Sequence, residues 1–296
     1  MSEIELSVVL ADTGGGWSID AAVRALNESC LSLVTELIVV RTAGHRGPDV
    51  PRLDFSAVRV EQSRSGVLTP HLWGTGATFA RGRVVAFTTD QQRVGRSWAR
   101  ALCETIDKGV VGVGGPIVLS PHADSGTTAA YFVRFSAFTP EAWPGIAPAR
   151  DVAGDNAAYE RAAVVRHDDL LREGFWEVEF HRRFEREGRQ LQMVPGAVAT
   201  LAGPMSFRAL MSQRFLHARE FGAARVRRHG ESRTKLLLSA PLVPFVLLGR
   251  MGRRTMSAGR YRRQFVRSLP ALFVLAVAWA AGEVFGGLGH GRERER

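Results

Sequence analysis

Short apolar runs alternate with amphipathic stretches through the N-terminal part of the chain. Five runs have the length and composition of buried strands: Ser7–Leu10 (SVVL), Glu36–Val40 (ELIVV), Ala57–Val60, Val84–Phe87 and Gly109–Val113. Residues 19–33 show helical spacing instead, with Ile19, Val23, Leu26 and Cys30 on one stripe. Strands separated by helices predict βαβ units, and therefore an α/β fold with a mainly parallel central sheet flanked by helices.

The segment from residue 153 to residue 200 has a different pattern. We expect a helix over Ala157–Leu171, then a charged helix from about Glu177 to Glu187 that stops at Gly188. A strand over Gln190–Val194 follows. In parallel sheets, ligands lie beyond the carboxyl ends of the strands, so the residues after Val40 and Phe87 are the first candidates for chemistry.

The C-terminal part is both basic and apolar. An Arg-rich helical stretch over residues 205–233 precedes two apolar segments, 236–249 and 269–289, joined by an Arg-rich loop. Pro241 and Pro244 interrupt the first segment, which is too short to cross about 30 Å of hydrocarbon and favours an interfacial or re-entrant helix. The second segment either crosses once or also lies in the interface. A buried core hairpin is the alternative for both.

The positive charge is concentrated in this tail. The 296 residues carry a net charge of +10. Residues 1–204 hold 21 Lys and Arg against 24 Asp and Glu, a net of −3, whereas residues 205–296 hold 18 against 5, a net of +13. This distribution favours an anionic membrane surface as partner and argues against nucleic acid, which would need a basic patch on the globular part.

The cysteines and the N-terminus point to a reducing compartment. Cys30 and Cys103 are far apart and lack metal-ligand spacing, so both are expected to be reduced core residues. The N-terminal residues lack the charged and apolar regions of a secretory signal. The globular part is therefore expected to face the cytoplasm from the cell membrane.

The glycine run Gly14-Gly15-Gly16 follows the first predicted strand and could bring the backbone close to a phosphate. It matches neither the dinucleotide-binding nor the P-loop signature, so a plain loop is the competing interpretation.

Six segments in a fixed order resemble the inverting family 2 glycosyltransferases. They are SVVL, ELIVV, GTGATFARGRVVAFTTDQQRVGRSWARAL, GGPIV, AGDNAAYERAAV and GFWEVEFHRRFEREGRQLQMVPGA. The resemblance covers roughly residues 5–220 and implies a GT-A fold. It places a glycosyltransferase-like domain at residues 1–220 and a membrane-attachment region at residues 221–296.

The resemblance implies a donor site at the strand ends, with Asp12, Arg41, Asp90 and Gln92 as nucleotide contacts. The family usually places an Asp-x-Asp motif where this chain has Thr88–Gln92, so only Asp90 remains as a carboxylate for Mg²⁺ or Mn²⁺. A simple turn role for Asp90 is the alternative. The chain also departs from the family after Val40, where Arg41 replaces an acidic residue, at Trp73–Gly76 and at Val198–Thr200, where a histidine ligand is missing.

Two further segments match the family better. Gly154, Asp155 and Asn156 resemble the loop that lines the acceptor-sugar pocket, although Asp155 or Asn156 could simply cap a helix. Trp176-Glu177 aligns with the family's acidic pair, which implies that Glu177 is the general base and that Trp176 lines the pocket. A favourable charge in a first helical turn is the alternative for Glu177.

A last segment, Gln213-Arg214-Phe215 with Arg219, resembles one that closes over the diphosphate, with Gln213 and Arg214 as contacts. An amphipathic helix face is the alternative. The expected function is transfer of a sugar, with inversion, from a nucleotide-sugar to a lipid-linked or cell-envelope acceptor. The alternative is a glycosyltransferase-like binding or scaffold protein without catalysis.

Overall fold

The computed structural model describes residues 3–14, 19–45, 47–203 and 205–289. The chain forms two compact units: a first unit of Met1–Pro121 with Phe138–Gly203, and a second unit of His122–Ala137 with Pro204–Arg296. Each unit is described by itself. Residue 220, where we expected a domain boundary, lies within a helix of the second unit.

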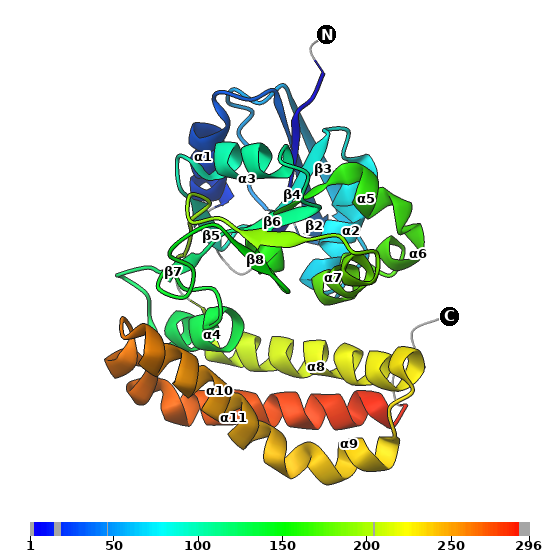
Figure 1. Ribbon diagram of the computed structural model, residues 1–296, viewed down its shortest axis with the longest axis vertical. Helices are drawn as coiled ribbons and strands as arrows, with labels where there is room; N and C mark the ends of the chain where they lie inside the picture. The colour runs from blue at the N-terminus through cyan, green and yellow to red at the C-terminus, as the bar shows by residue number, and fades with distance from the viewer. Residues whose placement is uncertain (1–2, 15–18, 46, 204, 290–296) are drawn as a thin grey trace. The chain divides into compact units, whose positions relative to one another are not determined.

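The first unit is built on an eight-stranded sheet with the order β3-β2-β1-β4-β9-β6-β10-β8 (Figure 1). The strands are β1 Leu6–Asp12, β2 Thr35–Thr42, β3 Ala57–Ser63, β4 Val84–Thr89, β6 Gly112–Gly114, β8 Ala147–Ala149, β9 Ala157–Glu160 and β10 Leu191–Met193. Strands β1 to β4 pair in parallel, as do β6 and β10, whereas β9 and β8 are antiparallel to their neighbours. The expected α/β class with a mainly parallel sheet is confirmed.

Helices lie on both sides of this sheet. The first unit contains α1 Ile19–Cys30, α2 Thr69–Phe79, α3 Trp98–Ile106, the short 3-10 helix η1 Gly154–Asn156, α5 Arg161–Arg166, α6 Asp168–Leu171 and α7 Glu177–Arg186. A small second sheet pairs β5 Gln92–Val94, β11 Ala199–Leu201 and β7 Ile117–Leu119. Apolar residues of α2, α5 and α7 share one core with the sheet, while α1 and α3 pack together on the other side (Figure 1).

Aromatic rings fill the core between the sheet and α7. Phe87 of β4 stacks on Phe175 with ring centroids 4.1 Å apart, and Phe175 stacks on Phe180 of α7 at 4.5 Å. Tyr159 of β9 lies edge-on to Phe175. These contacts hold the start of α7 against the centre of the sheet. Cys30 and Cys103 are free and buried, as expected.

The prediction of a helix over Ala157–Leu171 is wrong for its first four residues. Residues 157–160 form β9, which inserts between β4 and β6. Helical structure starts only at Arg161, and His167 separates α5 from α6. The sequence Ala-Ala-Tyr-Glu suits either structure. The vacant position between two parallel strands, which only the tertiary fold creates, selects the strand.

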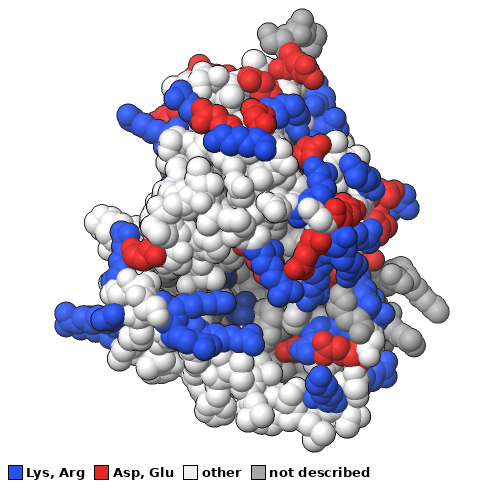
Figure 2. All heavy atoms as spheres, in the orientation of Figure 1, with Lys and Arg blue, Asp and Glu red and all other residues white. Residues whose placement is uncertain are grey.

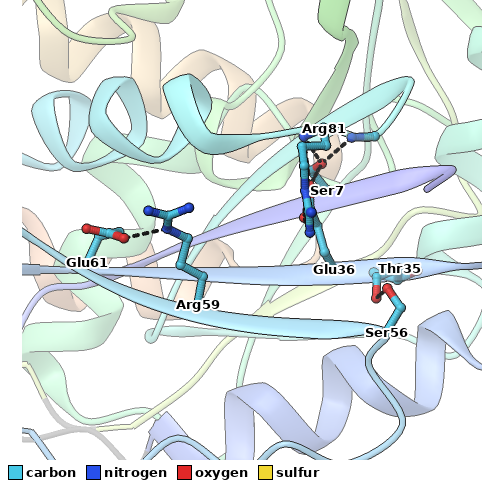
Figure 3. A network of polar contacts seen from close by, with 8 residues as sticks. Ser7, Thr35, Glu36, Ser56, Arg59, Glu61 and Arg81 are labelled. Atoms are coloured by element: carbon cyan, nitrogen blue, oxygen red, sulfur yellow. Dashed lines mark hydrogen bonds and ion pairs between the residues drawn. The ribbon is translucent and has the colours of Figure 1, made fainter. Parts of the chain in front are cut away.

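A buried carboxylate ties the amino ends of β1, β2 and β4 together (Figure 3). Glu36 of β2 accepts a hydrogen bond from the Ser7 hydroxyl at 2.6 Å, and from the backbone N–H and guanidinium of Arg81. Ser7 in turn accepts from the backbone N–H of Gly82 at 2.7 Å. Burial raises the pKa of Glu36, but the hydrogen bonds from Ser7 and Arg81 outweigh it and leave the pKa below its usual value.

We predict that Glu36→Gln destabilises the protein at pH 7.5 by about 1–3 kcal/mol, because it removes charge-assisted hydrogen bonds inside the fold. Since the folded pKa is lowered, this contribution is present above the unfolded pKa and is lost as the pH falls through the folded one. Chemical denaturation measures the effect. The control is Glu61→Gln, which removes the more exposed pair with Arg59 (Figure 3) and should change stability by no more than about 0.5 kcal/mol. Equal effects would contradict the prediction.

The second unit is helical throughout its described elements. They are α4 Ser125–Phe135, α8 Phe207–His229, α9 Arg233–Ser239, the 3-10 turn η2 Ala240–Leu242, α10 Val243–Ala258 and α11 Arg262–Gly287. The break at η2 falls at Pro241, as expected from the prolines. Two stretches, Arg233–Ala258 and Arg262–Gly287, are long and apolar enough to cross a membrane by length and composition.

The prediction of an Arg-rich loop between the two apolar segments is wrong. Residues 250–258 continue α10 and residues 262–267 open α11, which leaves only a short turn around Gly259. Arginine has a high helix propensity, so the charge of this region does not prevent helix formation. The charged C-terminal residues 292–296 lie outside the described residues.

Helix α11 packs closely along α8, and the two run in the same direction (Figure 1). Small residues make the contact: a side chain at Gly282 or Gly286 of α11 would overlap the backbone carbonyl of Phe215 or Arg219, and one at Gly222 of α8 would overlap that of Glu283. At the same interface Arg214 lies 4.0 Å over the Trp279 ring, and the buried Glu283 pairs with Arg225. Trp279, Gly282 and Glu283 therefore lie on the face of α11 that contacts α8.

We predict that Gly286→Ala lowers the stability of the second unit by about 1–3 kcal/mol, because the added methyl group forces α11 away from the α8 backbone. Gly249→Ala on α10 is the matched control. A side chain there has no neighbour within 4 Å, so the change should be neutral or stabilise the helix by up to about 1 kcal/mol. Thermal unfolding in detergent compares the two. Equal losses would show that α8 and α11 do not pack as described.

Candidate functional site

The carboxyl ends of β1 and β2 meet at an ion pair. Asp12 and Arg41 are direct partners in the parallel register, and the Arg41 Nε donates to Asp12 Oδ2 at 2.7 Å. The two terminal guanidinium nitrogens donate to the backbone carbonyls of Gly47 and Pro48 at 3.3 and 2.6 Å. Arg41, expected to contact the nucleotide, therefore binds the loop after β2 to Asp12. His45 of that loop lies 3.4 Å from the other Asp12 oxygen.

Asp90, directly after β4, is buried beside Asp12. Its backbone N–H donates to the Ala11 carbonyl, and its side chain accepts from the Thr13 hydroxyl at 2.9 Å. Burial raises the pKa of Asp90 to about 6; the charge of Asp12 adds to this effect, while the Thr13 hydrogen bond and Arg93 oppose it. Two neighbouring carboxylates thus lie at the ends of adjacent central strands. Gly15 and Gly16 of the glycine run lie outside the described residues.

Gln92 links this edge of the sheet to η1. Its amide nitrogen donates to Asp155 Oδ2 at 3.3 Å, and both side chains are buried. The amide oxygen of Gln92 has no hydrogen-bond partner among the described residues. A buried carbonyl oxygen without a partner is unfavourable, and a bound water, a ligand donor or a cation can satisfy it.

Asn156 follows Asp155 in η1 and is fully buried. Its amide oxygen accepts from the Trp98 ring nitrogen at 2.7 Å, and its amide nitrogen donates to the carbonyls of Pro116 and Ala197. Both amide hydrogens are used within the protein. These hydrogen bonds show that Asn156 holds η1, and with it Asp155, in position, and that its amide hydrogens are not available to a sugar.

Gly154 brings the Glu177 carboxyl to η1. A side chain at this glycine would lie 3.1 Å from the Glu177 carboxyl carbon and 3.0 Å from the Trp73 ring. Glu177 is the first residue of α7, where the helix dipole favours a negative charge. The Trp73 ring nitrogen donates to the Thr88 carbonyl of β4 at 2.8 Å. The absence of a side chain at Gly154 therefore lets a carboxyl group and an aromatic ring lie close to one piece of backbone.

Trp176 precedes Glu177 at the start of α7 and is only partly buried. Its ring nitrogen donates to the Glu173 carbonyl at 3.1 Å, and its ring lies edge-on to His71 at 5.7 Å between centroids. The structure thus places the partly exposed Trp176 ring next to His71 at the start of α7, and its pocket role stays a prediction.

A polar chain that runs from the buried Tyr159 and His181 to the exposed Asp151 was not predicted from the sequence. The Tyr159 hydroxyl lies 2.8 Å from His181 Nε2, and His181 Nδ1 lies 3.2 Å from Asp151 Oδ1. Burial lowers the pKa of His181 more than Asp151 raises it, and the pKa of Tyr159 is raised by burial and by the charge of Glu177. The signal was present: His181 comes four residues after Glu177, on the same helix face.

Gln213 and Arg214, expected at the diphosphate, belong to α8 in the second unit. Arg214 stacks on Trp279, and its buried Nε has no hydrogen-bond partner within the described part of the chain. Burial and the neighbouring Arg134 lower the pKa of Arg214 to about 9. Within its own unit, the Arg214 side chain therefore contributes to the packing of α8 on α11.

The metal-binding capacity of the site is limited. Among the described residues, no group of three or more His, Cys, Asp or Glu side chains could hold a metal ion. The oxygens of Asp90 and Gln92 are the donor type that Mg²⁺ and Mn²⁺ prefer, and the unpartnered Gln92 oxygen fits such a role. A cation at this site would need further ligands from the substrate.

No family model and no curated protein matches this chain.

The buried Asp90 gives a test of the site. Because its folded pKa of about 6 exceeds its ordinary 3.8, the folded state binds more protons than the unfolded state between these values, and stability falls as the pH rises through this window. We predict that Asp90→Asn stabilises the protein by about 1–3 kcal/mol at pH 7.5, and by less at pH 5.

Thermal and chemical unfolding at both pH values measure this difference. Asp49→Asn is the control, since Asp49 is exposed on the loop after β2, and it should change stability by no more than about 0.5 kcal/mol. A destabilised Asp90→Asn protein at pH 7.5 would mean that the carboxylate has a purely structural role.

Proposed function

We propose that the protein is a membrane-associated glycosyltransferase that moves a sugar, with inversion, from a nucleotide-sugar to a lipid-linked or cell-envelope acceptor. The observation that carries the proposal is the convergence of four separated segments at one edge of the sheet. They are the ends of β1 and β4, the η1 helix and the start of α7. These segments were selected from the sequence by their resemblance to family 2 glycosyltransferases.

We assign the converging groups separate roles in binding the donor, the cation and the acceptor. Asp12 and Asp90 place carboxylates at the strand ends, where a donor's ribose hydroxyls can donate hydrogen bonds to them. The unpartnered Gln92 oxygen and Asp90 would hold Mg²⁺ or Mn²⁺, which would neutralise the leaving diphosphate when bound. Asp155 and Gly154 form the acceptor side, next to the Glu177 carboxyl.

Inverting transfer needs one base at the acceptor. Glu177 takes the proton from the acceptor hydroxyl while the acceptor oxygen forms the new bond to the anomeric carbon. The bond from that carbon to the diphosphate oxygen breaks, and the nucleoside diphosphate leaves with the electron pair. The Tyr159–His181–Asp151 chain joins α7 to β9 and to the loop before η1, and so helps to hold α7 in place.

The apolar helices of the second unit would attach the enzyme to the cell membrane with its catalytic unit on the cytoplasmic side, close to a lipid-linked acceptor. The alternative is a binding or scaffold protein with the same fold. The observation that favours it is Arg41, which is bound to Asp12 and to the following loop.

We predict that Glu177→Gln lowers sugar transfer by about 10²–10⁴-fold, because the amide cannot accept the acceptor proton. Donor binding, measured as the shift in melting temperature with each nucleotide-sugar and Mg²⁺ or Mn²⁺, should persist. Glu179→Gln is the matched control. Glu179 lies on the same helix in a partly buried ion pair with Arg182, and its loss should leave turnover within about twofold.

Three results would contradict the proposal. Unchanged transfer by Glu177→Gln would remove the assigned base. A failure of every nucleotide-sugar to shift the melting temperature would favour the scaffold alternative. Equal losses in the Glu177 and Glu179 variants would indicate a structural effect on α7 instead of a chemical one.

A further inference from the structure

The second unit exposes a large apolar surface on α9, η2, α10 and α11. Its most exposed members are Leu238 at 74%, Leu242 at 63% and Phe245 at 63%. The other exposed apolar residues of these helices are Leu237, Val246, Met256, Val266, Leu269, Phe273, Val274, Val277, Phe285 and Leu288. Monomeric soluble proteins rarely leave so many large apolar side chains in water, so this surface calls for an occupant.

Helix α11 has two different faces. Phe265, Leu272, Leu275 and Ala276 are buried against other helices of the unit. Val266, Leu269, Phe273 and Val277 follow the spacing of one helical stripe and are exposed. One side of α11 therefore contacts protein and the other is apolar and open, as in helices that lie in the plane of a membrane interface.

The charge of α8 argues against an α11 that crosses the membrane. Six arginines are spread along α8: Arg208, Arg214, Arg219, Arg225, Arg227 and Arg228. The glycine contacts set the register of the two parallel helices: Gly282 and Gly286 of α11 lie against Phe215 and Arg219 of α8. In this register Arg208, Arg214 and Arg219 lie beside the C-terminal half of α11, so a membrane-crossing α11 would take them into the hydrocarbon, at about 2.5–3.5 kcal/mol for each one near its centre.

Positive charge dominates the segment that carries the apolar surface. Between Glu231 and Glu283 the sequence contains no Asp or Glu, but it contains eight arginines and one lysine. Seven of these arginines are exposed around the turn between α10 and α11: Arg250, Arg253, Arg254, Arg260, Arg262, Arg263 and Arg267. Figure 2 shows Lys and Arg side chains gathered at the end of the unit where α10 meets α11, next to uncharged surface. This combination matches the headgroups and acyl chains of an anionic leaflet.

We propose that α9, α10 and α11 lie flat in one anionic membrane leaflet and that no helix of this unit crosses the bilayer. The exposed apolar stripe enters the acyl-chain region, the arginines of the α10–α11 turn contact lipid phosphates, and α8 stays on the aqueous side of α11. This orientation rests on the membrane attachment contained in the proposed function, but not on sugar transfer.

Side-specific labelling of the full chain tests the orientation. Ser257→Cys places a thiol at the end of α10 and Gly289→Cys places one after α11, both at exposed positions outside the apolar surface. In sealed inside-out vesicles from the expression host, a membrane-impermeant maleimide should label both thiols to the same extent before and after detergent. The unchanged chain, with Cys30 and Cys103 buried, gives the background. Protection of either thiol until detergent is added would overturn the proposal, because any crossing α11 separates these two positions.

Vesicle binding tests the lipid occupant. The full chain, diluted from detergent, should bind vesicles of phosphatidylcholine with 30% phosphatidylglycerol at least about tenfold more tightly than phosphatidylcholine alone. Leu238→Asp with Phe245→Asp should weaken binding at least about tenfold, whereas Leu31→Asp, at a residue 67% exposed on the first unit, should not. Equal binding to both vesicles, or a double variant that loses self-association but keeps vesicle binding, would overturn the proposal.

Glycosyl transfer measured in parallel separates the two proposals. Loss of transfer with equal labelling of both thiols would remove the proposed function and leave the orientation intact. Retained transfer with one protected thiol would do the reverse.

Discussion

The register of β1 against β2 places a polar pair at both ends of one buried parallel ladder. Ser7 lies opposite Glu36 and Asp12 lies opposite Arg41, and in both pairs the side chains bond directly. A shift by one residue would turn every side chain of the strand to the other face and break both pairs at once. The interior of the ladder is apolar and could slide, so these pairs specify the alignment. The alignment in turn decides which residues meet at the carboxyl edge.

Buried carboxylates at the two ends of the central strands have different surroundings. At the amino edge, Glu36 is surrounded by donors, so burial is compensated and the carboxylate keeps a low pKa. At the carboxyl edge, Asp90 has one hydroxyl donor and another carboxylate for a neighbour, and its pKa rises. Carboxylates with raised pKa values cluster at the functional sites of proteins.

The second unit follows a different constraint, which is close approach between helix backbones. Gly222, Gly282 and Gly286 remove the side chains that would keep α8 and α11 apart, and the Glu283–Arg225 pair lies beside this contact. Because one face of α11 is fixed to a charged helix, its apolar residues are divided between a protein-facing and an open side. The total hydrophobicity of the segment alone does not describe this division.

Local patterns in the sequence determined the strands β1 to β4, the α7 helix, the strand β10 and the interruption by Pro241, because each depends on the periodicity or backbone geometry of its own residues. The strand β9 and the helical continuation through the arginines of 250–267 were decided by tertiary structure, since these sequences are compatible with more than one local conformation.

The residues chosen as candidates after β1 and β4, in η1 and at Glu177 could be selected from the sequence. Their neighbours could not: Thr13 beside Asp90, Gly47 beside Arg41 and His181 beside Tyr159 are contacts across the fold. A linear pattern gives the face and the element on which a side chain lies, but only the packed structure gives its partners, its burial and hence its pKa.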